Sequence, residues 1–123
     1  MGNFCMIKLR LSFERRLRLV GVLDGIPAPY MVRKRLNKIQ DSLAPTDEET
    51  AAAKFTVDSA AGLYKWDPNH TPAPVEISLA PADAALLASS LTSENVAWHR
   101  TEIAWLEDKL AVLRGEAYSP SAD

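Results

Sequence analysis

The stretch SENVAWHRTEIAWLEDKLAVLR, residues 93–114, predicts the long helix around which this chain is organised. It contains no proline or glycine, Ser93 is a suitable N-cap, and Gly115 follows where a glycine commonly ends a helix. Two lines of apolar side chains run along the predicted helix. The first line contains Val96, Ile103, Leu106, Leu110 and Leu113, and the second contains Trp98, Trp105 and Val112.

A helix with two apolar faces needs two partners, and a chain of 123 residues can cover one face more easily than both. We therefore expect one face to lie in the core. The face with Trp98, Trp105 and Val112 is expected to contact a second copy of the chain, because Trp is enriched at the centres of interfaces. The alternatives are core packing of both tryptophans or stacking on a nucleotide base.

A run of short helices and then a run of short strands occupy most of the rest of the chain, which predicts an α+β fold. Residues 54–58 and 63–67 predict a β-hairpin, and residues 75–79 predict a third strand. Residues 6–11 predict a short strand or only a lead-in. We expect one domain over residues 1–115, in which helices pack with a three-stranded antiparallel sheet, and a frayed tail over residues 116–123.

Local signals mark where further helices begin. Helices are predicted over residues 13–23, 30–43 and 46–53 and from Pro81 onward. Ser12 is the expected N-cap of the first, and Thr46 with Glu49 has the spacing of a capping box. The inner face of the first helix is predicted to carry Phe13, Leu17, Val20 and Leu23.

The composition is that of an ordinary soluble globular chain, with 47% hydrophobic and 24% charged residues. The single cysteine, Cys5, excludes an internal disulfide and fits a reducing compartment. No apolar run approaches the ~20 residues that a membrane span needs. We therefore expect a cytoplasmic protein without a membrane partner.

Residues that carry metal or nucleophilic chemistry are scarce. A zinc site needs about four Cys, His or carboxylate ligands, whereas this chain has two His and one Cys. It has no G-x-x-x-x-G-K-[ST], G-x-G-x-x-G or G-x-S-x-G motif. We expect no metal, no cofactor and no catalytic residue, and hence a protein that is not an enzyme.

The net charge of −2 conceals two oppositely charged parts. Residues 1–40 carry nine basic and two acidic residues, a net charge of +7, and residues 41–123 carry a net charge of −9. Such a split favours an anionic partner for the first third, or pairing of the two parts. The helix at 30–43 is expected to present a basic outer face, for which plain solvation is the alternative. This face carries Arg33, Lys34, Arg35 and Lys38.

We expect an anionic ligand such as a nucleotide to meet these four cations. Tyr64 and Trp66 on the hairpin and His99 on the long helix are candidate partners for its base. Structural roles in the core or an interface are the alternative for these three residues. The helices at 13–23 and 30–43, with a hairpin behind them, are also consistent with a winged helix-turn-helix, so DNA binding is a third hypothesis.

A pattern of four segments extends from residue 7 to about residue 91. It comprises IKLRLSFERRLRLVGVL (7–23), LAPTDEET (43–50), YKW (64–66) and VEISLAPADAALLASSL (75–91). In this pattern the chain resembles the small accessory proteins encoded by phages and prophages, although its proline-rich linker at 24–29 and its Trp-bearing last helix depart from the type. The resemblance implies a phage protein in the bacterial cytoplasm, and it carries over no functional residue.

These observations together predict a non-enzymatic, self-associating binding protein. The leading hypothesis is a counter-defence protein that sequesters an anionic host signal such as a nucleotide. The alternative is an adaptor or inhibitor of a host protein, or a particle-assembly protein, with no small ligand.

Overall fold

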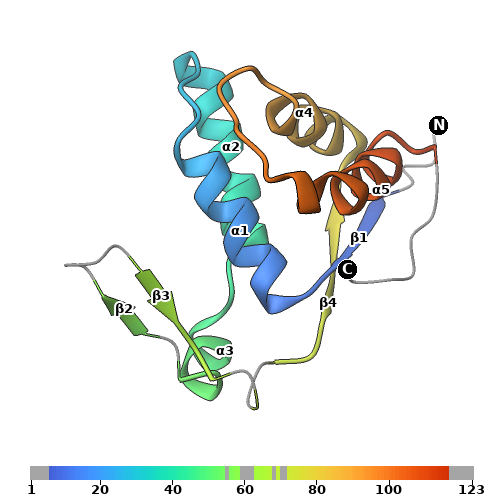
Figure 1. The fold of residues 1–123 in the computed structure, drawn as a ribbon. Coiled ribbons are helices and arrows are strands. Elements are labelled where there is room, and N and C mark those ends of the chain that lie inside the picture. Colours follow the sequence, from blue (N-terminus) through green and yellow to red (C-terminus); the bar gives the residue numbers. More distant parts are fainter. Residues whose placement is uncertain (1–5, 55, 59–62, 68, 70–71, 117–123) are drawn as a thin grey trace.

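One strand, three helices, three strands and two helices follow one another in the computed structural model, which describes residues 6–116 except 55, 59–62, 68 and 70–71 (Figure 1). The predicted α+β class and the small single domain are confirmed. The helices are α1 (Phe13–Asp24), α2 (Tyr30–Leu43), α3 (Asp47–Ala52), α4 (Pro81–Leu91) and α5 (Ile103–Leu113). The strands are β1 (Ile7–Leu11), β2 (Thr56–Asp58), β3 (Leu63–Lys65) and β4 (Val75–Leu79). All but Glu116 of the predicted tail lies outside the described residues.

The strands described by the structure form two separate two-stranded sheets, so the predicted three-stranded sheet is not present. β2 pairs with β3 as the predicted hairpin, but β4 pairs antiparallel with β1. β4 pairs with β1 because each of these two strands has one apolar face to bury. Their pairing joins the two faces and buries Leu9, Leu11, Ile77 and Leu79.

The helices pack side by side around this apolar face. α1 packs against α2 and α4, and α5 packs against α4 and β1 (Figure 1). The hairpin and α3 lie together at the other end of α1 from the turn that joins α1 to α2 (Figure 1). The buried side chains of α1 are Phe13, Arg16, Leu19 and Leu23. The prediction was therefore wrong for Leu17, whereas Val20 is partly buried and packs against the core.

The buried face of α1 includes Arg16, because the guanidinium of Arg16 forms hydrogen bonds with groups at the end of α2 and in α3. Its side chain is 4% exposed. It donates to the carbonyl oxygens of Leu43 at 3.0 Å and Ala44 at 3.1 Å, and to the two Glu49 carboxylate oxygens at 2.6 and 2.9 Å. The Glu49 carboxylate also accepts a hydrogen bond from the backbone N–H of Thr46, which confirms the predicted capping box. Arg16 therefore fastens α3 to α1.

The predicted helix over residues 93–114 is wrong in its first ten residues. α5 begins only at Ile103, after a 3-10 turn, η2 (Arg100–Glu102). The chain before it must turn back so that α5 can pack on α4, and a continuous helix would prevent this. Trp98 fixes this connection by donating from its indole nitrogen to the carbonyl of Leu91 at 2.9 Å.

In α5, side chains from both predicted apolar lines pack within the same chain. Leu106, Leu110 and Leu113 are buried, and so are Trp105 and Val112, at 7% and 4% exposure. The two lines thus merge into one buried arc, which also contains Lys109, and Ile103 lies outside it at 40% exposure. Contact of Trp105 and Val112 with a second copy stays a prediction, and it would require these side chains to leave the core.

Candidate functional site

Two of the four cations of the basic face predicted on α2 are paired within the chain. Arg33 donates to the carbonyl oxygens of Leu23 and Ile26, both at 2.8 Å, and thereby caps the end of α1. Arg35 forms a salt bridge of 2.7 Å with Asp83 of α4. Lys34 and Lys38 are exposed, and no carboxylate of the described residues pairs with either.

Replacing Arg33 by Met is expected to lower the free energy of unfolding by about 1.5–3 kcal/mol, because two carbonyl groups lose a charged donor. Lys34→Met, one residue further along the same helix, should change it by less than about 0.5 kcal/mol. Urea denaturation followed by circular dichroism measures both values. Equal values for the two variants would show that Arg33 does not cap α1.

A groove of about 490 Å³ runs along α1. Its lining includes two cations, two carboxylates and one aromatic ring. We call this hollow the α1 groove, and its residues are Glu14, Arg15, Leu17, Arg18, Gly21, Trp66 and Glu102. Its volume lies within the range of small-molecule sites, which is roughly 300–1,000 Å³.

Helical spacing explains why α1 presents these groups together. Leu17, Arg18 and Gly21 are three or four residues apart, so they lie on the side turned away from Arg16 and Leu19. Arg15 lies at the edge of this side, three residues before Arg18 and four before the buried Leu19. Gly21 has no side chain, and a Cβ added there would meet nothing within 4 Å. The middle of the groove is therefore open because this position carries no side chain.

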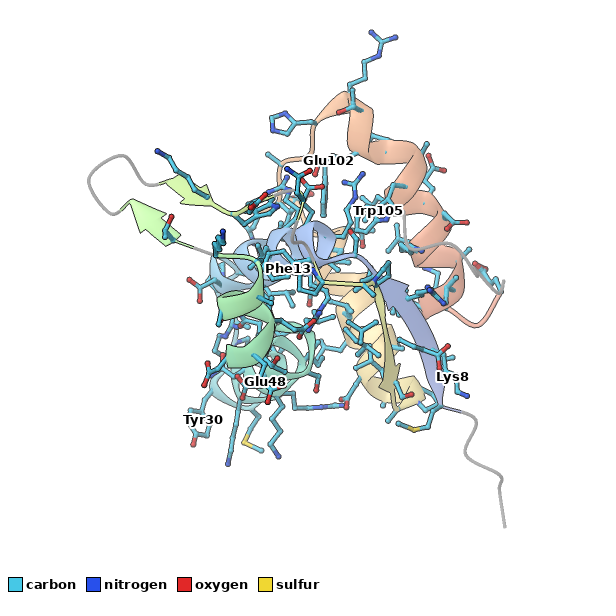
Figure 2. The ribbon with its side chains drawn as sticks, turned by 90° about the horizontal axis from the view of Figure 1, so that it is seen from below. Lys8, Phe13, Tyr30, Glu48, Glu102 and Trp105 are labelled. Carbon is cyan, nitrogen blue, oxygen red and sulfur yellow. The ribbon has the colours of Figure 1, made fainter. Side chains whose placement is uncertain are left out.

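Each groove arginine lies on the face of a tryptophan ring. The Cζ atom of Arg15 is 4.5 Å from the centre of the Trp105 ring, and that of Arg18 is 5.0 Å from the centre of the Trp98 ring. These distances are those of cation–π contacts. The two indole rings thus help to hold the two guanidinium groups beside the groove. Figure 2 shows Trp105 and Glu102 on the same side of the molecule.

Glu102 fixes the position of Arg18 further. The Arg18 guanidinium donates to both carboxylate oxygens of Glu102, at 2.8 and 3.0 Å, and approaches the carbonyl of Ala97 at 3.4 Å. The hydrogen bond from Arg18 lowers the pKa of Glu102 to about 2, and the backbone N–H of His99 adds to this effect while burial opposes it. The same bond raises the pKa of Arg18.

Of the predicted ligand residues whose side chains the structure describes, only Trp66 lines the α1 groove. Trp66 meets the buried Phe13 ring edge to face, with ring centres 6.0 Å apart. Tyr64 belongs to β3, and its side chain lies outside the part that the structure describes. His99 is exposed and lies in the connection before η2, not on a helix face as predicted.

Sequence reasoning missed the α1 residues of the groove because it treated α1 only as a core helix. A signal was present in Gly21, since a glycine inside a helix is unfavourable by roughly 0.5–1 kcal/mol relative to alanine. The spacing of Arg15 and Arg18 was a second signal. No local pattern connected either arginine with Trp105, Trp98 or Glu102.

Other features of the described residues bear on the remaining predictions. No helix there is long and apolar enough to cross a membrane. No group of three His, Cys, Asp or Glu side chains among them could hold a metal ion. In comparisons with known proteins, no family model matches the chain, and no curated protein or solved structure is significantly similar to it.

Proposed function

We propose that this chain is a non-enzymatic binding protein that holds a nucleotide in the α1 groove. The observation that carries the proposal is the placement of Arg15 and Arg18 on tryptophan rings beside a groove that Trp66 also lines. An oriented guanidinium can hold a phosphate, and an aromatic ring can stack on a base. The groove therefore combines the two kinds of contact that a nucleotide requires.

Each groove residue has a distinct part in this binding. Trp66 stacks on the base, and the guanidinium edge of Arg15 meets a phosphate oxygen. Arg18 is held by Glu102, so it supplies a fixed positive charge and does not itself move to the ligand. Gly21 allows the ligand to lie close to the backbone of α1.

The balance of charge favours a cyclic nucleotide over a nucleoside triphosphate. Among the described residues that line the groove, the charged ones are two cations and two carboxylates, so their net charge is zero. A phosphodiester carries one negative charge and needs only one cation, whereas a triphosphate would repel Glu14 and Glu102. The Glu14 carboxylate can accept a hydrogen bond from a ribose hydroxyl or a base amino group.

This proposal includes the phage origin that the sequence pattern implies. A small phage protein that binds a cyclic nucleotide without turnover would lower the concentration of a host immune signal, as a counter-defence protein does. A duplex-DNA site on α2, by contrast, would need Arg33 or Arg35 to leave its partners within the chain.

Calorimetry of the purified, ligand-stripped chain tests the proposal with cyclic mono- and dinucleotides, nucleoside triphosphates and a mixed-sequence DNA duplex. We expect a cyclic nucleotide to bind below ~100 μM and more tightly than the triphosphates. Arg15→Met should weaken its affinity about 10- to 150-fold, which corresponds to a charge-assisted hydrogen bond of about 1.5–3 kcal/mol. Absorbance near 260 nm in the protein before stripping would be an independent sign of a bound nucleotide.

Gly21 offers a sharper pair of variants. Gly21→Leu fills the groove and should reduce nucleotide affinity more than about 10-fold, while Gly21→Ala should raise the free energy of unfolding by roughly 0.5–1 kcal/mol. Lys34 lies outside the groove, so the variant Lys34→Met should bind the nucleotide as tightly as the wild type. Unchanged binding by Gly21→Leu would exclude the groove as the site. Failure of every nucleotide to bind would leave the adaptor or inhibitor of a host protein as the better hypothesis.

A further inference from the structure

The most exposed large apolar side chains described by the structure lie side by side at the start of α2. Tyr30 is 76% exposed and Met31 is 66% exposed. At about 100° per residue, both share the outer face of α2 with Lys34 and Lys38, opposite the buried Leu36, Ile39 and Leu43. We call Tyr30, Met31, Lys34 and Lys38 the α2 outer face. Exposed apolar groups with charged neighbours are typical of contact surfaces.

The side chains of the two lysines of this face have no ion-pair partner among the described residues. Arg33 and Arg35, which alternate with them, are held by the end of α1 and by Asp83. No salt bridge of the described residues includes Lys34 or Lys38. The α2 outer face therefore combines two apolar anchors with two unpaired positive charges, and the exposed Asp41 on the same side of α2 leaves it with a net positive charge of one.

A surface of the opposite charge lies on the same molecule, beyond the other end of α2 (Figure 1). Asp47 and Glu48 in the first turn of α3 are exposed, and no salt bridge of the described residues includes them. Glu49, their neighbour, is held by Arg16. Figure 2 shows Tyr30 and Glu48 on the same side of the molecule, away from Trp105. One side of the chain thus presents both a positive and a negative patch.

We propose that a second copy of the chain docks on this side, with the α2 outer face of each copy against α3 of the other. A two-fold axis places each positive patch opposite a negative patch, so every charge contact occurs twice. Tyr30 and Met31 supply the apolar centre, and the charged pairs at the rim set the register. The face is small for a stable dimer, which buries about 800 Å² per partner. The dimer is therefore expected to be weak and sensitive to salt. This interface does not depend on the proposed nucleotide site.

Analytical ultracentrifugation from 5 to about 500 μM in low salt tests the dimer. We expect the wild type to dimerise with rising concentration. The double variant Lys34→Glu/Lys38→Glu and the double variant Asp47→Lys/Glu48→Lys should each raise the dissociation constant more than about 10-fold. An equimolar mixture of the two should dimerise again, because both contacts in the mixed pair join opposite charges.

Matched controls separate this interface from general charge effects. The double variant Arg100→Glu/Arg114→Glu changes the net charge by the same amount as Lys34→Glu/Lys38→Glu, but at exposed positions elsewhere. It should dimerise like the wild type. The double variant Tyr30→Ser/Met31→Ser tests the apolar anchors without changing the net charge, and it should also weaken the dimer. It replaces a charge variant in the test if circular dichroism shows that the charge variant does not fold. A wild type that is monomeric up to 500 μM overturns the proposal and leaves the face for a different partner. A dimer that Lys34→Glu/Lys38→Glu leaves intact, or a mixture that stays monomeric, overturns it as well.

Discussion

Replacing Arg16 by Met is expected to lower the free energy of unfolding by about 3–5 kcal/mol, the usual effect of removing one partner of a buried ion pair. The guanidinium is 4% exposed and bonds the Glu49 carboxylate and the carbonyl oxygens of Leu43 and Ala44. Met fills a similar volume and suits a helix, but it cannot donate. Three acceptors would therefore lose their donor together.

Urea denaturation at neutral pH measures this effect, with Lys34→Met as the exposed control on α2. Arg16→Lys separates charge from geometry, because an ammonium cannot reproduce the paired contact of the guanidinium with both Glu49 oxygens. We expect Arg16→Lys to recover less than half of the loss. A loss below about 1 kcal/mol for Arg16→Met would show that α3 does not depend on this contact.

Acidification is expected to destabilise the fold between about pH 4.5 and pH 2. The hydrogen bond from Arg16 lowers the pKa of Glu49 from 4.5 to about 2, and the hydrogen bond from Arg18 does the same for Glu102. A carboxyl group whose folded-state pKa is depressed binds its proton more readily in the unfolded chain. Its contribution to stability is complete above about pH 4.5 and is lost as the pH falls toward 2. Each group contributes a slope of at most about 1.4 kcal/mol per pH unit.

Glu49→Gln and Glu102→Gln should each flatten this pH dependence. Both variants should be less stable than the wild type at pH 6 and should approach it near pH 2, where the wild-type carboxyl groups begin to be protonated. Glu107→Gln, at an exposed position of α5, should keep the wild-type pH dependence. Urea denaturation at pH 6, 4.5, 3.5 and 2.5 gives the comparison. Parallel curves for the wild type and both variants would contradict the assignment.

The helix ends were predictable because their chemistry is local. Ser12 accepts a hydrogen bond from the backbone N–H of Arg15, and Thr46 accepts one from Glu49, as the sequence predicts. Pro81 occupies the first turn of α4. Each of these signals acts within three or four residues, so it operates whatever the rest of the chain does. The α1 groove was not predictable in this way, because it requires Trp66 and Glu102 to meet α1.

The α+β class and most helix boundaries thus follow from local sequence signals. The strand pairing, and which basic side chains are buried or exposed, depend on the tertiary structure. The patterns of β1 and β4 allow either strand to pair elsewhere, and only a shared core selects their pairing. Likewise, Arg16 and Lys34 are both cations on amphipathic helices, yet one is buried and the other exposed. Burial of a cation is favourable only where acceptors from distant segments replace its water, and such acceptors are in place only once the chain has folded.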